Sequence, residues 1–236
     1  MEINKDNKYT NMQKTQYEND ASFWSVDFRD PVVGAFDSHN TWCDYDEFLF
    51  KDINKDTLEL KMLDFGCGPG RNIVKFNSNF KQIDGVDISQ KNIDNAKDWI
   101  TFNDCKMGNL YVNNGCDLSV IKKNVYDVIM STICFQHICV YDIRKNLLKE
   151  FYRVLKNGGL LTMQMGFGIS HPRTVGYYDN NYDAEGTNSM CDTRVESPEE
   201  LEKDLIEIGF KDFKYYIRPV GPGDGHTNWI FFNVKK

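Results

Sequence analysis

Apolar residues in the central part of the chain form short runs that alternate with segments of helical periodicity. Between the runs, Ile93 and Ile100 have helical spacing after a capping Ser89. A later helix with apolar residues from 147 to 155 is expected to end at the turn 157–159. Strands that alternate with helices in this order predict a parallel sheet with right-handed crossovers. Five apolar runs predict its buried strands: 60–65, 82–87, 109–114, 125–131 and 159–165.

The last third of the chain has a different pattern. Segment 166–196 is rich in Gly, Asn, Asp and Tyr and has no regular period, so we expect an irregular, functional loop. A capping box at Ser197 then begins a helix that ends at Gly209. Two more strands follow, joined by nine residues without a helix and therefore expected to be antiparallel: 213–218 and 228–234.

The first 55 residues have neither pattern, being polar at first and then unusually aromatic. Apolar and aromatic residues at helical spacing predict an amphipathic helix near 41–53. We expect residues 1–55 to form an aromatic cap or lid on an α/β domain of residues 56–236, in which 166–196 is an irregular substrate-lid insertion. The domain is predicted to hold a seven-stranded, mostly parallel sheet with an antiparallel last strand and helices on both faces.

Composition and charge narrow the classes of partner. The 236 residues are 41% hydrophobic and 27% charged, which suits one globular core and excludes disordered and fibrous proteins. A net charge of −7 without a basic stripe disfavours a nucleic-acid partner. No apolar stretch approaches the roughly 20 residues of a membrane helix, and the N-terminus has no apolar signal-peptide core. Seven cysteines without a CxxC pair predict reduced thiols in a cytoplasmic protein without structural zinc.

The most specific signal is segment 63–70, LDFGCGPG, which closes the first predicted strand. Its glycines permit a tight strand-to-helix turn and let a ligand approach the backbone. The spacing is G-x-G-x-G, whereas dinucleotide-binding folds use G-x-G-x-x-G to seat a pyrophosphate. Asp64 precedes the glycines, and a carboxylate there repels a pyrophosphate but attracts an ammonium group. The segment therefore favours a ligand with a sugar, an amino group and no phosphate; the alternative is another nucleotide-binding α/β protein.

Motifs in the same order resemble the class I S-adenosylmethionine-dependent methyltransferases over about residues 60–165, including 126–129 and 153–159, which match the fourth strand and the turn before the fifth. The glycines of segment 63–70 match that family's glycine loop, and Asp87 lies where its acidic residue holds both ribose hydroxyls. Segment 113–118 lies where the family encloses adenine, although the usual Gly-Asp-Ala is absent there. The resemblance implies a Rossmann-like fold, S-adenosyl-L-methionine as methyl donor with S-adenosyl-L-homocysteine as product, and no metal.

The resemblance also implies a set of cofactor contacts. Ile88 is expected to pack on the adenine face and Asp117 to bind the adenine amino group, while Asp64 is either a ligand or a carboxylate that stabilises the turn. The whole expected set is Asp64, Phe65, Gly66, Cys67, Gly68, Gly70, Arg71, Asp87, Ile88, Asn114, Asp117, Leu118 and Thr132.

The substrate is expected beyond the carboxyl ends of the parallel strands. His137 follows the fourth strand and His226 lies in the turn before the last one, so both are candidate general bases for a hydroxyl acceptor. The structural alternative for His137 is a histidine that caps a helix. Tryptophans that pack in the core and arginines that stay solvated are the alternatives for the substrate contacts, which we expect at Trp24, His39, His171, Arg173 and Tyr178.

The residues after the fourth strand narrow the acceptor. Segment 131–134 reads STIC, whereas similar enzymes that methylate exocyclic base nitrogens or protein glutamine carry an Asn/Asp-Pro-Pro-aromatic run there. We expect an enzyme that moves the methyl group by in-line displacement to an oxygen or nitrogen of a small-molecule metabolite. A monomer or homodimer without membrane or nucleic-acid partners is expected. The alternatives are a methyltransferase acting on tRNA or protein, and a non-catalytic S-adenosylmethionine-binding partner subunit.

Overall fold

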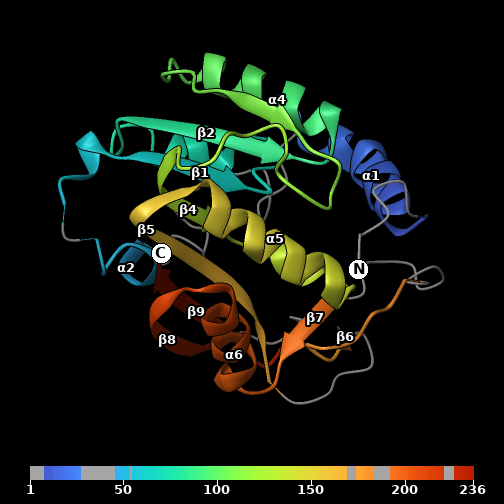
Figure 1. Ribbon diagram of the computed structural model, residues 1–236. Helices are drawn as coiled ribbons and strands as arrows, with labels where there is room; N and C mark the ends of the chain where they lie inside the picture. Colours follow the sequence, from blue (N-terminus) through green and yellow to red (C-terminus); the bar gives the residue numbers. More distant parts are fainter. Residues whose placement is uncertain (1–7, 28–45, 54, 169–173, 183–191, 221–225) are drawn as a thin grey trace.

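A computed structural model describes residues 8–27, 46–53, 55–168, 174–182, 192–220 and 226–236 of the chain (Figure 1). The strands within these ranges are β1 (Lys61–Phe65), β2 (Gln82–Asp87), β3 (Leu110–Val112), β4 (Tyr126–Ser131), β5 (Leu155–Phe167), β6 (Thr174–Val175), β7 (Asp192–Val195), β8 (Lys211–Pro219) and β9 (Asn228–Lys235). The helices are α1 (Lys8–Asp20), α2 (Asp46–Leu49), α3 (Arg71–Lys75), α4 (Gln90–Phe102), α5 (Tyr141–Val154) and α6 (Pro198–Ile208).

The sheet has the predicted parallel centre and antiparallel edge. Strands β3, β2, β1, β4 and β5 are neighbours in this order and run parallel to one another. Strand β9 then pairs antiparallel with β5 on one side and with β8 on the other. The α/β class, the mostly parallel sheet and the antiparallel last strand are therefore confirmed.

Two features of the sheet differ from the prediction. The described sheet has nine strands rather than seven, because segment 166–196, expected to be irregular, contributes β6 and β7. Strand β5 runs beyond its last pairing with β4 at Met163, and the free backbone edge at Gly166 and Phe167 pairs with β7. The preceding helix also ends earlier than predicted, at Val154, because β5 already pairs with β4 at Leu155.

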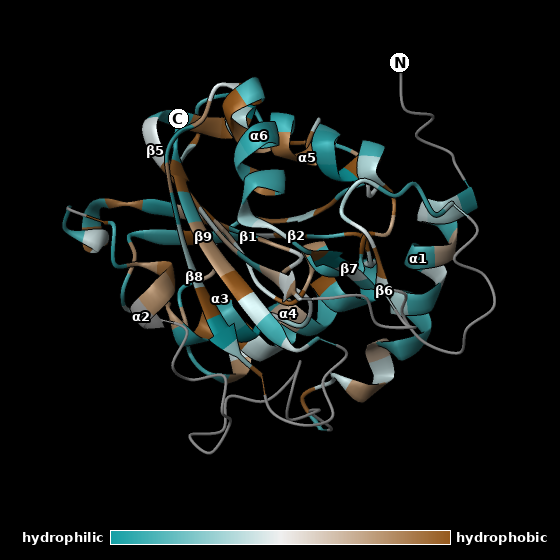
Figure 2. Ribbon diagram, turned by 90° about the horizontal axis from the view of Figure 1, so that it is seen from below, coloured by the Kyte–Doolittle hydropathy of each residue, from teal (hydrophilic) through white to brown (hydrophobic). Residues whose placement is uncertain are grey.

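Helices cover both faces of the sheet, as predicted. Seen from below, α5 and α6 lie on one face and α2, α3 and α4 on the other (Figure 2). Successive side chains of β1 point to opposite faces of the sheet. Leu63 belongs to the apolar cluster under α5, and Met62 belongs to the cluster under α3 and α4. No helix in the described ranges is long and apolar enough to cross a membrane.

The N-terminal helix α1 lies beyond the strand ends, beside α4 (Figure 1). The carboxylate of Glu18 accepts a hydrogen bond from the backbone N–H of Gln90 at 2.7 Å, and Asn95 donates to the carbonyl of Ala21 at 2.8 Å. These contacts hold the helix over the carboxyl edge of the sheet. Of the helix predicted near 41–53, the described part is α2; residues 41–45 lie outside the described ranges.

The capping box of α6 gives a direct stability prediction. The Ser197 hydroxyl accepts from the N–H of Glu199, and the Glu200 carboxylate accepts from the N–H of Ser197. We expect Ser197→Ala to lower the free energy of unfolding by about 1 kcal/mol, because it leaves an amide at the helix start without its acceptor. Urea denaturation measures the change, with the exposed Ser78→Ala as matched control, expected within about 0.5 kcal/mol of wild type. Equal stabilities for the two variants would contradict the prediction.

Candidate functional site

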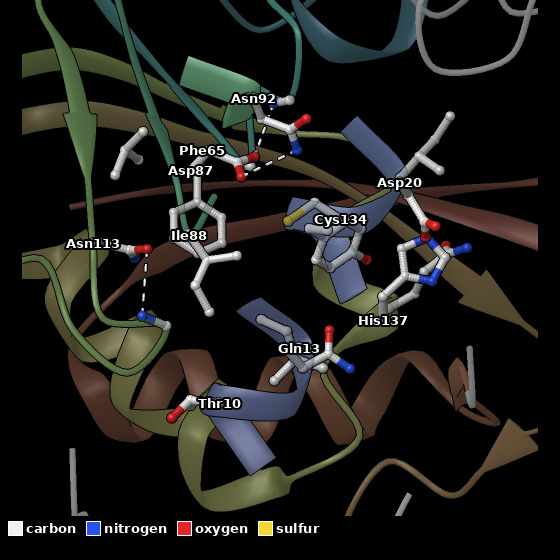
Figure 3. A pocket seen from close by; sticks show the side chains of 18 of the residues that line it. Thr10, Gln13, Asp20, Phe65, Asp87, Ile88, Asn92, Asn113, Cys134 and His137 are labelled. Atoms are coloured by element: carbon white, nitrogen blue, oxygen red, sulfur yellow. Dashed lines mark hydrogen bonds between the residues drawn. The ribbon is translucent and has the colours of Figure 1, made fainter. Parts of the chain in front are cut away.

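A cavity of about 490 Å³ opens at the carboxyl ends of β1, β2 and β4, underneath α1 (Figure 3). This volume lies within the usual range for sites that bind small molecules and cofactors. Its position is also the one expected for a ligand of a parallel α/β sheet. The lining residues are Tyr9, Thr10, Gln13, Tyr17, Asp20, Trp24, Phe65, Gly66, Gly68, Val86, Asp87, Ile88, Asn92, Asn113, Gly115, Ile133, Cys134, Gln136, His137, Ile138, Asp192 and Trp229.

The glycine loop forms one wall of the cavity. Gly66 and Gly68 line it, and both have left-handed backbone conformations, with φ of 70° and 49°. A Cβ atom on Gly66 would lie 2.0 Å from the Cys134 sulfur, so only glycine fits where the loop passes the end of β4. Gly70 packs against Ala96 of α4 and does not line the cavity.

Asp87 ends β2 with its carboxylate in the cavity wall. One oxygen accepts from the N–H of Gly68 at 2.9 Å, and the other accepts from the N–H of Ser89 at 2.9 Å and from the Asn92 amide at 3.4 Å. Burial raises the pKa of Asp87, and these hydrogen bonds oppose the shift. The carboxylate is thus held in one orientation by the glycine loop and by the start of α4.

Beside Asp87, the cavity wall is formed by the apolar side chain of Ile88 and the amide side chain of Asn113. Ile88 lines the cavity, and the oxygen of the Asn113 side chain accepts from the N–H of Gly115 at 3.3 Å (Figure 3). Gly115 has a φ of 77°, and a Cβ there would lie 2.6 Å from the Ile88 side chain. The turn that follows β3 therefore packs closely against Ile88 at the end of β2.

Asp64 lies deeper, and no atom of it lines the cavity. Its side chain is buried, and neither carboxylate oxygen has a hydrogen-bond partner among the described residues. Burial raises the pKa of Asp64 to about 7, while the positive charge of Arg71 opposes the shift and the charge of Asp87 adds to it. A buried carboxyl without a partner costs stability when it ionises, and its negative charge favours a cation nearby.

The structure brings part of the expected cofactor set to the cavity. Phe65, Gly66, Gly68, Asp87 and Ile88 line it. The remaining members lie behind its wall or away from it: Asp64, Cys67, Gly70, Arg71, Asn114, Asp117, Leu118 and Thr132.

Several of these outlying residues have contacts that stabilise the local backbone. The Asn114 side chain accepts from the N–H groups of Cys116 and Asp117, both at 2.9 Å, and the Asp117 carboxylate accepts from the N–H of Ser119 at 3.0 Å. Leu118 is fully buried in the core, and the Thr132 hydroxyl accepts from the Asn72 amide at 3.1 Å. In this turn the residues that reach the cavity are the neighbouring Asn113 and Gly115.

The two candidate histidines meet on one carboxylate that the sequence analysis did not single out. His137 Nδ1 lies 2.6 Å from one oxygen of Asp192, and His226 Nε2 lies 3.2 Å from the other. His137 and Asp192 line the cavity, whereas His226 is buried behind Asp192. Burial alone would raise the pKa of Asp192, but the charges and hydrogen bonds of both histidines hold it well below its ordinary value.

Helix α1 supplies the remaining wall. The Tyr9 hydroxyl accepts from the N–H of Cys139 at 2.6 Å and donates to the carbonyl of His137 at 3.2 Å, which ties α1 to the segment after β4. The rings of Tyr17 and Trp24 lie 6.3 Å apart at the cavity edge. The sequence analysis missed this helix because 8–20 is polar and lacks a regular apolar stripe, although it did predict an aromatic lid.

The expected substrate residues have different positions. Trp24 lines the cavity, but Tyr178 does not; this residue is 43% exposed, and its ring packs against Tyr141 of α5. His39, His171 and Arg173 lie outside the described residues.

The charges in the wall limit the ligands that the cavity suits. Asp20, Asp87 and Asp192 line it, and the described lining includes neither lysine nor arginine. Such a wall attracts a cationic ligand and repels a phosphate. A nucleoside with a sulfonium and an ammonium group fits it, because Asp87 offers oxygens to ribose, Ile88 offers an apolar face to a base, and the acidic wall offsets positive charge. The described residues contain no group of three metal-type ligands placed to hold an ion.

Comparisons with known proteins agree with this fit. Residues 63–163 match a family model described as a methyltransferase domain. No curated protein matches the sequence. Among solved structures, phosphoethanolamine N-methyltransferase 2 of Haemonchus contortus in complex with S-adenosyl-L-methionine is 17% identical, with a TM-score of 0.67 over 97% of this chain and 59% of that one. In a complex of the same enzyme with S-adenosylhomocysteine and phosphomonomethylethanolamine, the chain spans about half, 51%, of the enzyme's length.

Two other solved structures share the fold. A putative methyltransferase of Bacillus halodurans is 15% identical, with a TM-score of 0.61 over 82% of this chain and 98% of that one. The [4+2]-cyclase SpnF is also 15% identical, with a TM-score of 0.61 over 80% of this chain and 78% of that one. The expected resemblance is confirmed by the family match and by this shared fold, and SpnF illustrates that the fold alone does not define the reaction.

Proposed function

Because residues 63–163 match the methyltransferase-domain family, we propose that the protein is an S-adenosyl-L-methionine-dependent methyltransferase that methylates an oxygen or nitrogen of a small molecule. One observation carries the proposal: the carboxylate of Asp87, fixed by Gly68 and Ser89, stands in a cavity whose charged lining residues, among those described, are all acidic. This combination suits a ribose attached to a cationic sulfur and opposes a pyrophosphate.

Each part of the donor has a matching group in the chain. Asp87 would accept hydrogen bonds from the two ribose hydroxyls, and Ile88, which lines the cavity with Gly115, would pack on adenine. The glycine loop would follow the amino-acid part, with the buried charge of Asp64 beneath its ammonium group. When bound, S-adenosyl-L-methionine supplies an electrophilic methyl group on a sulfonium; the chain would align the acceptor and exclude water from it.

The acceptor side is formed by α1 and the histidine pair. His137 lies across the cavity from Asp87 (Figure 3), and Tyr17 and Trp24 also line the cavity. A cavity of about 490 Å³ under a helix suits a small molecule better than a tRNA or protein segment. The convergent His137 and Asp192 oppose the alternative of a cofactor-binding subunit without catalysis. We keep the expectation of a cytoplasmic enzyme as part of the proposal.

Binding and transfer test the proposed function together. We expect S-adenosyl-L-homocysteine to bind the purified chain in the micromolar range by titration calorimetry, and NAD, a nucleotide that carries a pyrophosphate, not to bind. Transfer of isotope-labelled methyl groups from S-adenosyl-L-methionine to small molecules would then identify acceptors. Binding of NAD without binding of S-adenosyl-L-homocysteine would overturn the proposal.

A further inference from the structure

The carboxylate of Asp192 lies between two imidazole rings that come from distant parts of the chain. His137 Nδ1 is 2.6 Å from one oxygen, and His226 Nε2 is 3.2 Å from the other. His137 belongs to the short 3₁₀ helix after β4, Asp192 begins β7, and His226 precedes β9. Three segments thus meet at the acceptor end of the cavity.

The fold makes specific room for this cluster. The ring of His226 lies against Gly166 of β5 so closely that a Cβ atom there would be 2.0 Å from its Cε1. The side chain of His226 is 1% exposed, and those of His137 and Asp192 are 13% and 16% exposed. Only the His137 end of the cluster therefore borders the cavity with a titratable ring, and the inner ring is shielded from solvent.

The hydrogen bonds decide which ring nitrogen carries the proton. A carboxylate only accepts hydrogen bonds, so His137 must donate from Nδ1 and His226 from Nε2. Neutral His137 then has its free lone pair on Nε2, and its ring lines the cavity. The Asp192 carboxylate thus fixes the tautomer of a histidine that lines the cavity, and His226 gives this carboxylate a second donor.

We propose that the methyl acceptor is a hydroxyl compound, that His137 accepts the hydroxyl proton, and that Asp192 and His226 are positioning residues for His137. The inference rests on the proposed function and deepens it. A hydroxyl oxygen needs a base as its bond to carbon forms, because an alcohol holds its proton strongly at neutral pH. An amine that binds in its neutral form already has a free electron pair and needs no base during the transfer itself.

The step balances with groups present in the site. The acceptor oxygen forms a bond to the methyl carbon, the carbon–sulfur bond breaks, and its electron pair stays on sulfur. The hydroxyl proton moves to Nε2 of His137, and the resulting imidazolium lies beside the ionised Asp192. The products are a methyl ether, a neutral thioether and a proton that leaves to solvent in the next step.

Besides His137 and Asp192, the titratable groups among the described lining residues are Asp20, Tyr9 and Tyr17 from α1, Cys134 after β4, and Asp87 from β2.

A labelled-methyl experiment tests the acceptor class without knowledge of the natural substrate. The full chain would be incubated with ¹³C-methyl S-adenosyl-L-methionine and a defined mixture of alcohols, phenols and sugars, each with its amine counterpart. Carbon–proton correlation spectra separate O-methyl from N-methyl products, and we expect O-methyl signals. N-methyl products, or no product from a chain that binds S-adenosyl-L-homocysteine, would overturn the inference. Failure to bind S-adenosyl-L-homocysteine would instead overturn the proposed function.

Variants test the positioning roles. We expect Asp192→Asn to lower kcat by about 10²- to 10⁴-fold with a much smaller change in the KM of the acceptor. His226→Gln should lower kcat about tenfold and leave S-adenosyl-L-homocysteine binding unchanged, since His226 does not line the cavity. The exposed Glu196→Gln is the matched control in the same segment.

A measurement without turnover completes the test. In the ¹⁵N spectrum of histidine-labelled protein we expect His137 protonated on Nδ1, with this preference lost in Asp192→Asn. Gly166→Ala should disturb the His226 signals, because the added Cβ would lie against the His226 ring. The β5 backbone should stay folded, because the φ of Gly166 is not in the left-handed region. A His137 protonated on Nε2 in the wild type, or an Asp192→Asn variant in which His137 keeps its preference for Nδ1, would overturn the positioning roles.

Discussion

Replacement of Asp87 by alanine is expected to weaken the binding of S-adenosyl-L-homocysteine at least about 100-fold. The variant would lack the two charge-assisted hydrogen bonds that the carboxylate is proposed to accept from the ribose hydroxyls, each worth about 1.5–3 kcal/mol. It would also release the N–H groups of Gly68 and Ser89, which loosens the glycine loop that forms the adjacent wall. Titration calorimetry at neutral pH measures the change.

Two controls separate a lost contact from a damaged fold. Asp98→Ala removes an exposed carboxylate from α4, the helix that follows Asp87, and should bind like wild type. Asp87→Asn keeps one oxygen as acceptor and should fall between wild type and alanine. A folded Asp87→Ala protein, judged by its thermal transition, that binds S-adenosyl-L-homocysteine within twofold of wild type would contradict the ribose assignment.

The second large effect concerns stability and pH at Asp64. Burial raises its pKa from 3.8 to about 7, so the folded state binds a proton more tightly than the unfolded state does. For a carboxyl whose pKa is raised on folding, stability falls as the pH rises from about 4 to about 7 and then stays constant. Asp64→Asn should therefore be more stable than wild type by a few kcal/mol at pH 8, since a shift of one pKa unit corresponds to about 1.4 kcal/mol.

The stability difference between Asp64→Asn and wild type should depend on pH. Asparagine resembles the protonated carboxyl, so most of the gain should be lost near pH 4, where Asp64 is protonated in the folded wild type. Urea denaturation across this pH range measures the difference, and the exposed Asp94→Asn on α4 should show none. A constant difference between pH 4 and pH 8, or a less stable Asp64→Asn at pH 8, would contradict the raised pKa.

Much of the central sheet could be predicted because its information is local. The runs around Leu63 and Val86 are apolar on both faces, as strands covered by helices on two sides must be. Ser89 and Ser197 are capping residues, and both accept hydrogen bonds from the first turn of their helices. The glycine loop has its positive φ angles where the G-x-G-x-G spacing indicated a tight turn.

The parts that the sequence did not reveal depend on contacts between distant segments. Asp192 lies in a segment without periodicity, and its importance becomes visible only when β7 pairs with the extended end of β5. Helix α1 has few apolar residues, and it is fixed by hydrogen bonds such as Tyr9 to Cys139, which are 130 residues apart. In the turn after β3, Asn113 and Gly115 line the cavity and Asn114 and Asp117 do not, because the side chains of the latter two accept hydrogen bonds within the turn itself.

By itself, the sequence determined the α/β class, the parallel strands, the glycine turn and the acidic end of β2, because each is set by residues within a few positions of one another. The tertiary structure decided which groups share the cavity: the residues of α1 that line it, and the carboxylate between His137 and His226. The physical reason is that a hydrogen bond between residues far apart in the chain leaves no periodic trace in the sequence. It exists only after the sheet has brought their strands to a common edge.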